Sequence, residues 1–418
     1  MKKLIIGGVI FVMIGTTSIG FSAYHHMGEQ DSDKFLTVYP DKAGTKLDHC
    51  ALCHSGGSYT NSKGKEVTLG SCQWCHDTYG YDGSGNIQDT LNQYGKDFQY
   101  NGRNEEAIAQ IESLDSDNDG YTNIAEIQAN NYPGNEMDDP SKVPAPYRVY
   151  TKAELEALPQ HTQFLLMNTS RSGDFYAEYS GVAMEDLLND AGMLDSATGI
   201  TAYAPDGWST YYPLEENVSA PELYHALGTY PAASFYYNTD ADTAFGGWCD
   251  YSAPSCTGRS HEDPIGVTGG LKMLLSIKRE NTYLTPGVLT EENKLDGEGP
   301  FRVVVPQKNP SPPDQSSISD NQNVIWPYTY EDDHNAGSSA RSVTIIKVEP
   351  LPQGTTDIDL LEAGWRYVDE EKVIIYGAIE SLDPNSEERS LDSLSDVNEG
   401  IGDDESDNKL GCFITTLF

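Results

Sequence analysis

Two short motifs constrain this chain more than any other feature of its sequence. Residues 50–54 read Cys-Ala-Leu-Cys-His and residues 72–76 read Cys-Gln-Trp-Cys-His, so both have the form C-x-x-C-H. In such a motif, each of the two thiols can form a thioether with one vinyl group of the same porphyrin. The histidine after the second cysteine can then ligate the iron. The sequence therefore predicts two covalent c-type haems, with attachment through Cys50, Cys53, Cys72 and Cys75 and iron ligation by His54 and His76.

The same cysteines also fit a structural zinc site. Their spacing, C-x2-C-x18-C-x2-C, falls within that of zinc ribbons, in which four thiolates hold the metal. Zinc would leave both histidines unexplained, although they stand at the same offset in the two motifs. Haem attachment also agrees better with an exported chain. We therefore expect two haems rather than zinc or paired disulfides.

The N-terminus has the pattern of a secretory signal peptide. Lys2 and Lys3 precede an apolar run over residues 4–14, which is too short to span a bilayer. Small residues follow, so we expect cleavage near Ala23 and assign residues 1–23 to the signal. We expect no membrane span after its removal, and a periplasmic, cell-surface or extracellular location.

The formal net charge is -39, from 65 acidic and 26 basic residues. This excess acts against binding of nucleic acid and of anionic membrane surfaces. It favours cationic partners, bound cations or a salty environment that screens the repulsion. A simpler explanation is that the charge keeps an exported protein soluble.

Three of the seven cysteines lie outside the haem motifs. Cys249 and Cys256 stand in an aromatic-rich stretch, 229–268, and we predict that they form a local disulfide in an oxidising compartment. Cys412 is left over near the C-terminus.

Residues 115–126 match the twelve-residue loop of an EF-hand. Gly120 stands where the loop turns sharply, and the pattern supplies the oxygen ligands that a hard cation requires. We expect a structural Ca²⁺ here, because only one such loop is present. The predicted ligands are Asp115, Asp117, Asp119, the carbonyl of Tyr121, Asn123 (often through a water) and Glu126.

The rest of the chain predicts an α+β protein with five successive segments. After the signal come a small haem-packed segment (24–103), the calcium loop with a linker (104–146), a mixed α+β domain (147–378) and an acidic, disordered tail (379–418). Apolar spacing predicts helices over 105–114, 182–193 and 269–277. Strands are predicted over 200–203, 302–306, 343–348 and 373–376.

The sequence does not fix the second axial ligand of either haem. The candidates are His25, His26, His49 and His161, with Met27 a weaker one. The motifs are close in sequence, so the two haems should be near neighbours, which suits electron hopping.

The chain resembles the GEGP-motif dihaem c-type cytochromes of anaerobic, often metal-reducing bacteria. The resemblance is carried by the two haem motifs, the calcium-type loop and residues 295–304, Leu-Asp-Gly-Glu-Gly-Pro-Phe-Arg-Val-Val. It implies an exported protein that transfers electrons between redox partner proteins or extracellular acceptors in anaerobic respiration. The tail end, Gly-Cys-Phe-Ile at 411–414, resembles a truncated CFI box, through which Cys412 would be a sorting or attachment point.

Residues 160–350 resemble the molybdopterin-binding domain of the sulfite oxidase superfamily. The matching stretches are 181–188 (Gly-Val-Ala-Met-Glu-Asp-Leu-Leu), 204–208 (Ala-Pro-Asp-Gly-Trp) and 299–306 (Gly-Pro-Phe-Arg-Val-Val-Val-Pro). That family places a molybdenum-ligating cysteine shortly before the helix, whereas residues 166–171 here read Leu-Met-Asn-Thr-Ser-Arg. The resemblance therefore implies the fold without sulfite oxidase catalysis, and it leaves molybdopterin doubtful.

The sequence leaves three functions open, each from a different class. In the first, the protein is an electron carrier whose second domain is a scaffold or docking surface, with both irons six-coordinate. In the second, it is a haem-linked oxidoreductase that uses a molybdopterin or an open haem site. A structural calcium- or zinc-binding protein without covalent haem is a third possibility. The missing cysteine favours the electron carrier.

Overall fold

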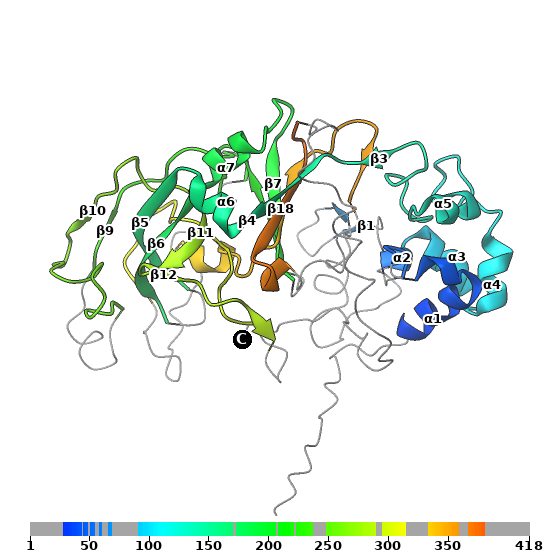
Figure 1. The fold of residues 1–418 in the computed structure, drawn as a ribbon, viewed down its shortest axis with the longest axis horizontal. Helices are drawn as coiled ribbons and strands as arrows, with labels where there is room; N and C mark the ends of the chain where they lie inside the picture. Colours follow the sequence, from blue (N-terminus) through cyan, green and yellow to red (C-terminus); the bar gives the residue numbers. More distant parts are fainter. Residues whose placement is uncertain are drawn as a thin grey trace, which may run out of the picture.

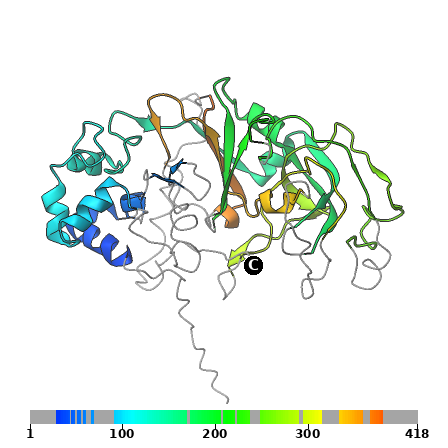
Figure 2. The ribbon, with the colours of Figure 1, turned by 180° about the vertical axis from the view of Figure 1, so that it is seen from behind.

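The computed structural model describes residues 28–43, 45–48, 51–54, 58–60, 66–68, 91–169, 173–205, 208–220, 223–236, 248–289, 295–314, 333–358 and 367–380. Over these ranges the protein is of mixed α+β class, as predicted. Five helices gather at one end and two large sheets form the other (Figure 1), and the view from behind shows the same division (Figure 2). The predicted signal peptide, Cys412 and all of the predicted tail except Ile379 and Glu380 lie outside the described residues.

The described N-terminal helices pack around a core of their own. They are α1 (Gly28–Val38), α2 (Ala51–His54), α3 (Gln93–Tyr100), α4 (Glu105–Ile111) and α5 (Asn123–Ala129), with a 3-10 turn η1 (Pro40–Lys42) and a small hairpin of β1 (Ser58–Thr60) and β2 (Glu66–Thr68). Phe35, Tyr94, Phe98 and Ile108 belong to one buried cluster. The sequence predicted little regular structure before residue 103, because these helices are too short for a clear period.

Helix α4 is shorter than predicted. It begins after Asn104, whose side chain accepts a hydrogen bond from the Ala107 amide, and it ends at Ile111. Ile108 and Ile111 face the core as expected, but Leu114 is 41% exposed. The prediction was wrong there because the chain turns at residues 112–114 to enter the acidic loop, where the Leu114 carbonyl accepts from the Asn123 amide.

The first large sheet is antiparallel. Its strands are β5 (Gln160–Met167), β6 (Phe175–Ala183), β11 (Leu274–Arg279), β12 (Thr282–Tyr283) and β15 (Arg302–Val304), in the order β12-β11-β6-β5 with β15 also paired to β11. The helix predicted over 269–277 is wrong, because residues 274–277 are the buried start of β11, which pairs with β6 and β15. Gly269 and Gly270, both at positive φ, lead into it rather than into a helix.

The second large sheet contains the strands that the sequence predicted best. Its strands are β4 (Tyr147–Thr151), β7 (Gly199–Tyr203), β8 (Ser209–Pro213), β16 (Ile345–Glu349) and β18 (Lys372–Gly377), in the order β4-β18-β16-β7-β8. Only the β16–β18 pair is parallel among them. The strands predicted over 200–203, 343–348 and 373–376 are confirmed to within two residues.

The main core lies between these two sheets. Val182 and Leu275 from the first sheet and Ile200, Ile346 and Ile375 from the second belong to one buried cluster. Helix α7 (Met184–Asp190) adds Met184, Leu187 and Leu188, while α6 (Lys152–Ala157) adds Leu155. The helix predicted over 182–193 begins two residues later, because Val182 and Ala183 still pair with β11.

Shorter elements complete the described fold. They are the pairs β9 (Ala233–Ser234) with β10 (Pro264–Ile265), β13 (Val288–Leu289) with β14 (Leu295–Asp296) and β3 (Val143–Pro144) with β17 (Thr355–Thr356), and the 3-10 turn η6 (Asn335–Ser338). The β3–β17 pair ties part of the predicted linker to the second half of the chain. Ile379, assigned to the tail, is buried and bridges Met193. Among the described residues, no helix is long and apolar enough to cross a membrane.

Candidate functional site

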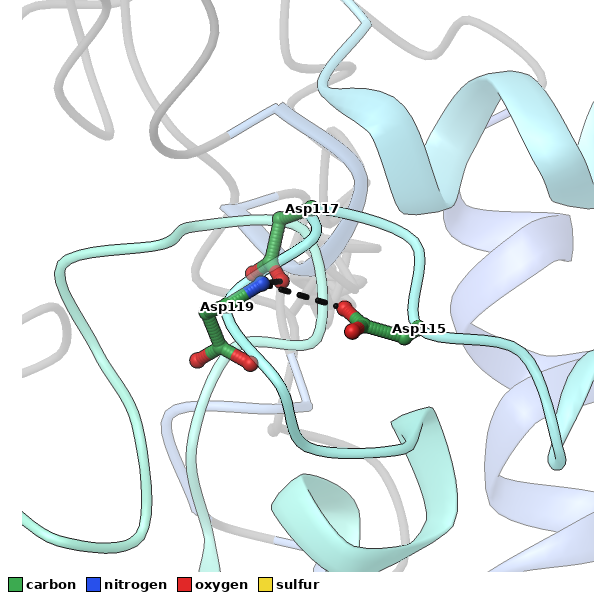
Figure 3. Close-up of side chains that lie close together, drawn as sticks. All are labelled: Asp115, Asp117 and Asp119. Atoms are coloured by element: carbon green, nitrogen blue, oxygen red, sulfur yellow. Dashed lines mark hydrogen bonds between the residues drawn. The ribbon is translucent and has the colours of Figure 1, made fainter.

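The acidic loop lies between helices α4 and α5. Asp115, Asp117 and Asp119 point toward a common space (Figure 3), and each offers a carboxylate oxygen within 4.8 Å of the others. Three like charges this close repel each other unless a cation lies between them. The arrangement agrees with the ligands predicted at the first three positions of the loop.

Backbone amides hold these carboxylates in place. The Asp119 amide donates to Asp115 Oδ1 over 3.1 Å, and the Gly120 amide donates to Asp115 Oδ2 over 3.0 Å. The Tyr121 amide donates to Asp119 Oδ1 over 2.8 Å. Asn118 and Gly120 both have positive φ, 65° and 101°, which lets the chain coil tightly around the acidic side chains.

Glu126 is the strongest sign of a cation. It lies on α5 with no exposed surface, and neither of its carboxylate oxygens has a hydrogen-bond partner among the described residues. One oxygen each of Asp117 and Asp119 is also buried without a partner in the described part of the chain. A buried carboxylate without a partner is strongly unfavourable, whereas a bound Ca²⁺ would satisfy these oxygens directly. The residues present therefore fit the predicted cation.

Without a cation, burial and the charges of this loop raise the pKa values of three of its carboxyl groups. Burial, and then the charges of Asp117 and Asp119, raise the pKa of Glu126 to about 9. Burial and the charge of Asp119 raise the pKa of Asp117 to about 7. Burial and the charge of Asp115 raise the pKa of Asp119. A bound divalent cation would reverse these shifts, because it favours the ionised carboxylates.

The side chain of Asn123, a predicted ligand, is hydrogen-bonded to other groups of the protein. Its Nδ2 donates to the carbonyl of Ile111 over 2.8 Å and to Ser116 Oγ over 2.9 Å, while its Oδ1 accepts from the Ser116 amide. It therefore closes the loop onto the end of α4. Ser116 Oγ in turn donates to Asp97 of α3 over 2.8 Å. These bonds rigidify the loop, and the motif by itself did not reveal them.

The first haem motif is partly described. Its residues Ala51–His54 form α2, in which Leu52 is buried in the helical core and Cys53 is half-buried against it. The Asn92 amide donates to the Cys53 carbonyl over 2.7 Å, and Asn92 Nδ2 donates to the Leu52 carbonyl over 2.9 Å. Residues Cys50, Cys72, Cys75 and His76 lie outside the described residues.

Two residues of α3 also bear on this motif. Gly95 packs so closely that a Cβ there would lie 2.6 Å from the Cys53 carbonyl oxygen. Tyr94 is buried, and its hydroxyl has no hydrogen-bond partner among the described residues. Burial, followed by the neighbouring Cys53, raises the pKa of Tyr94 well above the ordinary value. A buried hydroxyl of this kind beside a predicted attachment cysteine fits a bound group with acceptor atoms.

Of the distal-ligand candidates, His161 alone lies within the described residues. His161 lies on β5, in the sheet-rich part of the molecule far from α2 (Figure 1), and burial lowers its pKa. It is therefore no ligand for a haem on Cys53. His25, His26, His49 and Met27 lie outside the described residues.

In the stretch compared with the molybdenum-ligating segment, the described residues 166–169 serve packing and backbone hydrogen bonding. Leu166 and Met167 end β5 and pack into two different buried clusters. The Asn168 amide donates to Asn335 Oδ1 over 2.9 Å, and the Thr169 amide donates to Asp174 Oδ1 over 2.7 Å. No thiol stands in this stretch of the sequence. Cys249 and Cys256 form the predicted disulfide elsewhere, in a buried cluster that also contains Phe164 and Phe235.

Glu298 of the GEGP stretch belongs to a partly buried cluster of charged side chains. Glu298 lies 2.9 Å from Arg279 and 3.0 Å from Arg302, and Arg302 also donates to the hydroxyl of Tyr179 over 3.1 Å. Burial acts to raise the pKa of Glu298, but the two guanidinium groups outweigh it and hold the pKa below its ordinary value. Gly297 and Gly299 lie against the backbone of residues 284–287, where a Cβ would clash. The Glu298 carboxylate is thus paired on both of its oxygens by groups of the protein itself, which fits a structural role.

Comparisons of the chain with protein-family models, with curated proteins and with solved structures found no match.

Proposed function

We propose that this chain is an exported dihaem c-type cytochrome that transfers electrons between redox partners in anaerobic respiration. The observation that carries the proposal is the pair of C-x-x-C-H motifs at 50–54 and 72–76. When bound, haem would supply one-electron chemistry by cycling between ferric and ferrous iron. The cysteines would hold each porphyrin, and His54 and His76 would ligate the irons.

The described residues support this proposal in two ways. Asn92 and Gly95 hold the backbone of the first motif against α3, which would orient Cys53 for a fixed attachment geometry. Tyr94 offers a buried hydroxyl beside that cysteine, with no partner within the described protein. A preorganised site of this kind keeps the geometry of a redox centre similar in its two oxidation states.

The second half of the chain would act as a scaffold or docking surface. Its stretch at 166–169 is committed to packing and to backbone hydrogen bonds, and it contains no thiol. For this reason we prefer the electron carrier to a haem-linked oxidoreductase that uses molybdopterin. The calcium loop completes the proposal as a structural cation site.

A reduced pyridine haemochrome spectrum of the mature protein, with metal analysis of the same sample, tests the proposal. We expect about two covalent haems per chain, with calcium and without molybdenum. Replacing both Cys50 and Cys53 by Ala should remove one haem and leave the other. Stoichiometric zinc without haem would refute the proposal. Stoichiometric molybdenum, or rapid binding of carbon monoxide to an open iron, would favour the oxidoreductase.

A further inference from the structure

The buried carboxylate of Asp138 joins two parts of the molecule. One part contains helices α1–α5 and is called the helical part here, and the other contains the two large sheets. Asp138 is 2% exposed and accepts four hydrogen bonds. The donors are Lys46 Nζ at 2.6 Å, Asn131 Nδ2 at 2.7 Å, the Tyr132 amide at 2.9 Å and Thr356 Oγ1 at 2.8 Å. The first three belong to the helical part, whereas Thr356 is on β17, 218 positions further along the chain.

Backbone pairing continues this contact. The Val143 amide donates to the Gly354 carbonyl over 3.1 Å, and the Ala145 amide donates to the Thr356 carbonyl over 2.9 Å. These bonds belong to the β3–β17 pair, which lies between the helices and the large sheets (Figure 1). We call Asp138, Thr356 and the β3–β17 pair the junction.

The junction is connected directly to the acidic loop. The Glu126 carbonyl accepts from the Asn131 amide over 2.8 Å, and the side chain of Asn131 donates to Asp138. Glu126 is therefore linked by one backbone hydrogen bond to Asn131, which in turn donates to Asp138 of the junction. Asp138 and Asp139 are also close enough for their charges to act on Glu126 and Asp119, respectively.

We propose that Ca²⁺ in the loop 115–126 locks the junction, so that cation binding and attachment of the helical part to the sheets are thermodynamically coupled. The inference rests on the calcium site of the proposed function and is independent of the haems. Without a cation, the buried carboxylate of Glu126 has no ligand to hold it, and with it α5, against the loop. Any shift of α5 would displace Asn131 and Tyr132 from Asp138, and Asp138 would lose two of its four donors.

Hydrogen exchange on the full mature protein tests the coupling in one direction. We expect the Val143 and Ala145 amides to exchange at least about ten-fold faster in chelator than in saturating Ca²⁺. The Val343 amide, which donates to the Phe301 carbonyl over 2.9 Å inside the main core, is the internal control and should not change. Equal exchange in both conditions, in a protein that binds Ca²⁺, would overturn the inference.

Calorimetric titration of metal-free protein with CaCl₂ tests the reciprocal direction. Thr356→Val removes the junction donor on β17 and should weaken Ca²⁺ binding about five-fold, although it lies outside the loop. Thr282→Val, at an exposed position on β12, is the matched control and should bind like the wild type. Wild-type affinity in Thr356→Val would count against the coupling.

Glu126→Gln separates failure of the coupling from failure of the site. This substitution keeps the size of the side chain and removes the proposed bidentate charge, so we expect the calorimetric signal to disappear. Glu106→Gln, exposed on α4, should leave binding unchanged. If the wild type does not bind Ca²⁺ at all, the proposed site and the coupling both fail. If only Glu126→Gln loses binding while Thr356→Val and the junction amides are unaffected, the site stands and the coupling fails.

Discussion

At the scale of single residues, Glu298 shows how the GEGP stretch depends on charge. Its carboxylate is paired with two guanidinium groups, one of which belongs to the buried Arg302. Removing one partner of a buried pair is costly, because the remaining charge stays desolvated. Glu298→Gln should therefore destabilise the protein at neutral pH by about 3 kcal/mol.

The pairing of Glu298 with Arg279 and Arg302 also predicts how the stability of the protein changes with pH. The folded-state pKa of Glu298 lies below that of an unfolded chain, so the carboxylate contributes stability above about pH 4.5. This contribution is lost as the pH falls through the folded-state pKa. Thermal unfolding midpoints between pH 7 and pH 3 should therefore fall less steeply for Glu298→Gln than for the wild type. The exposed Glu262→Gln should follow the wild type, and parallel curves for all three proteins would refute the prediction.

At the scale of secondary-structure elements, the contact between α2 and α3 sets the geometry of the first haem motif. Helix propensity alone would favour Ala over Gly at position 95 by about 1 kcal/mol. The added Cβ would instead lie 2.6 Å from the Cys53 carbonyl oxygen, which is backbone and cannot rotate away. We expect this clash to outweigh the gain in propensity and to cost about 1–3 kcal/mol.

Gly95→Ala should thus reduce both stability and haem loading. The pyridine haemochrome spectrum gives the haem content per chain, and the midpoint of thermal unfolding reports the stability. Gly266→Ala is the matched control, because a Cβ there meets nothing within 4 Å and the backbone φ is ordinary. Unchanged haem loading in Gly95→Ala would mean that the α2–α3 contact does not orient the attachment site.

At the scale of the whole molecule, the net charge of -39 opposes compaction. Monovalent salt screens this repulsion over a length of about 10 Å at 0.1 M. We expect the thermal midpoint to rise between 0.01 M and 1 M NaCl, by about 2–4 °C for each kcal/mol of repulsion removed. Choline chloride should give the same rise, since screening does not depend on the cation. A fall in the midpoint with salt would show that attractive ion pairs dominate.

Some of this protein was predictable from local pattern. The three strands near residues 200, 345 and 375, the pair Cys249–Cys256 and the clustering of Asp115, Asp117 and Asp119 follow from alternation, proximity in sequence and fixed loop spacing. Each depends on residues that are neighbours along the chain. The haem motifs also are local patterns, and they stay predictions until haem is measured.

Other features depend on contacts between distant segments. Residues 274–277 of the predicted helix belong instead to β11, whose edges pair with three other strands, and a short apolar run does not reveal this. The role of Asp138 was not predicted from the sequence, since its four donors come from residues 46, 131, 132 and 356. The sequence by itself determined the chemistry that the chain can offer: thiols, imidazoles and a loop of carboxylates. Only the tertiary structure decided which of these groups are buried and unpaired, because burial is a property of long-range packing.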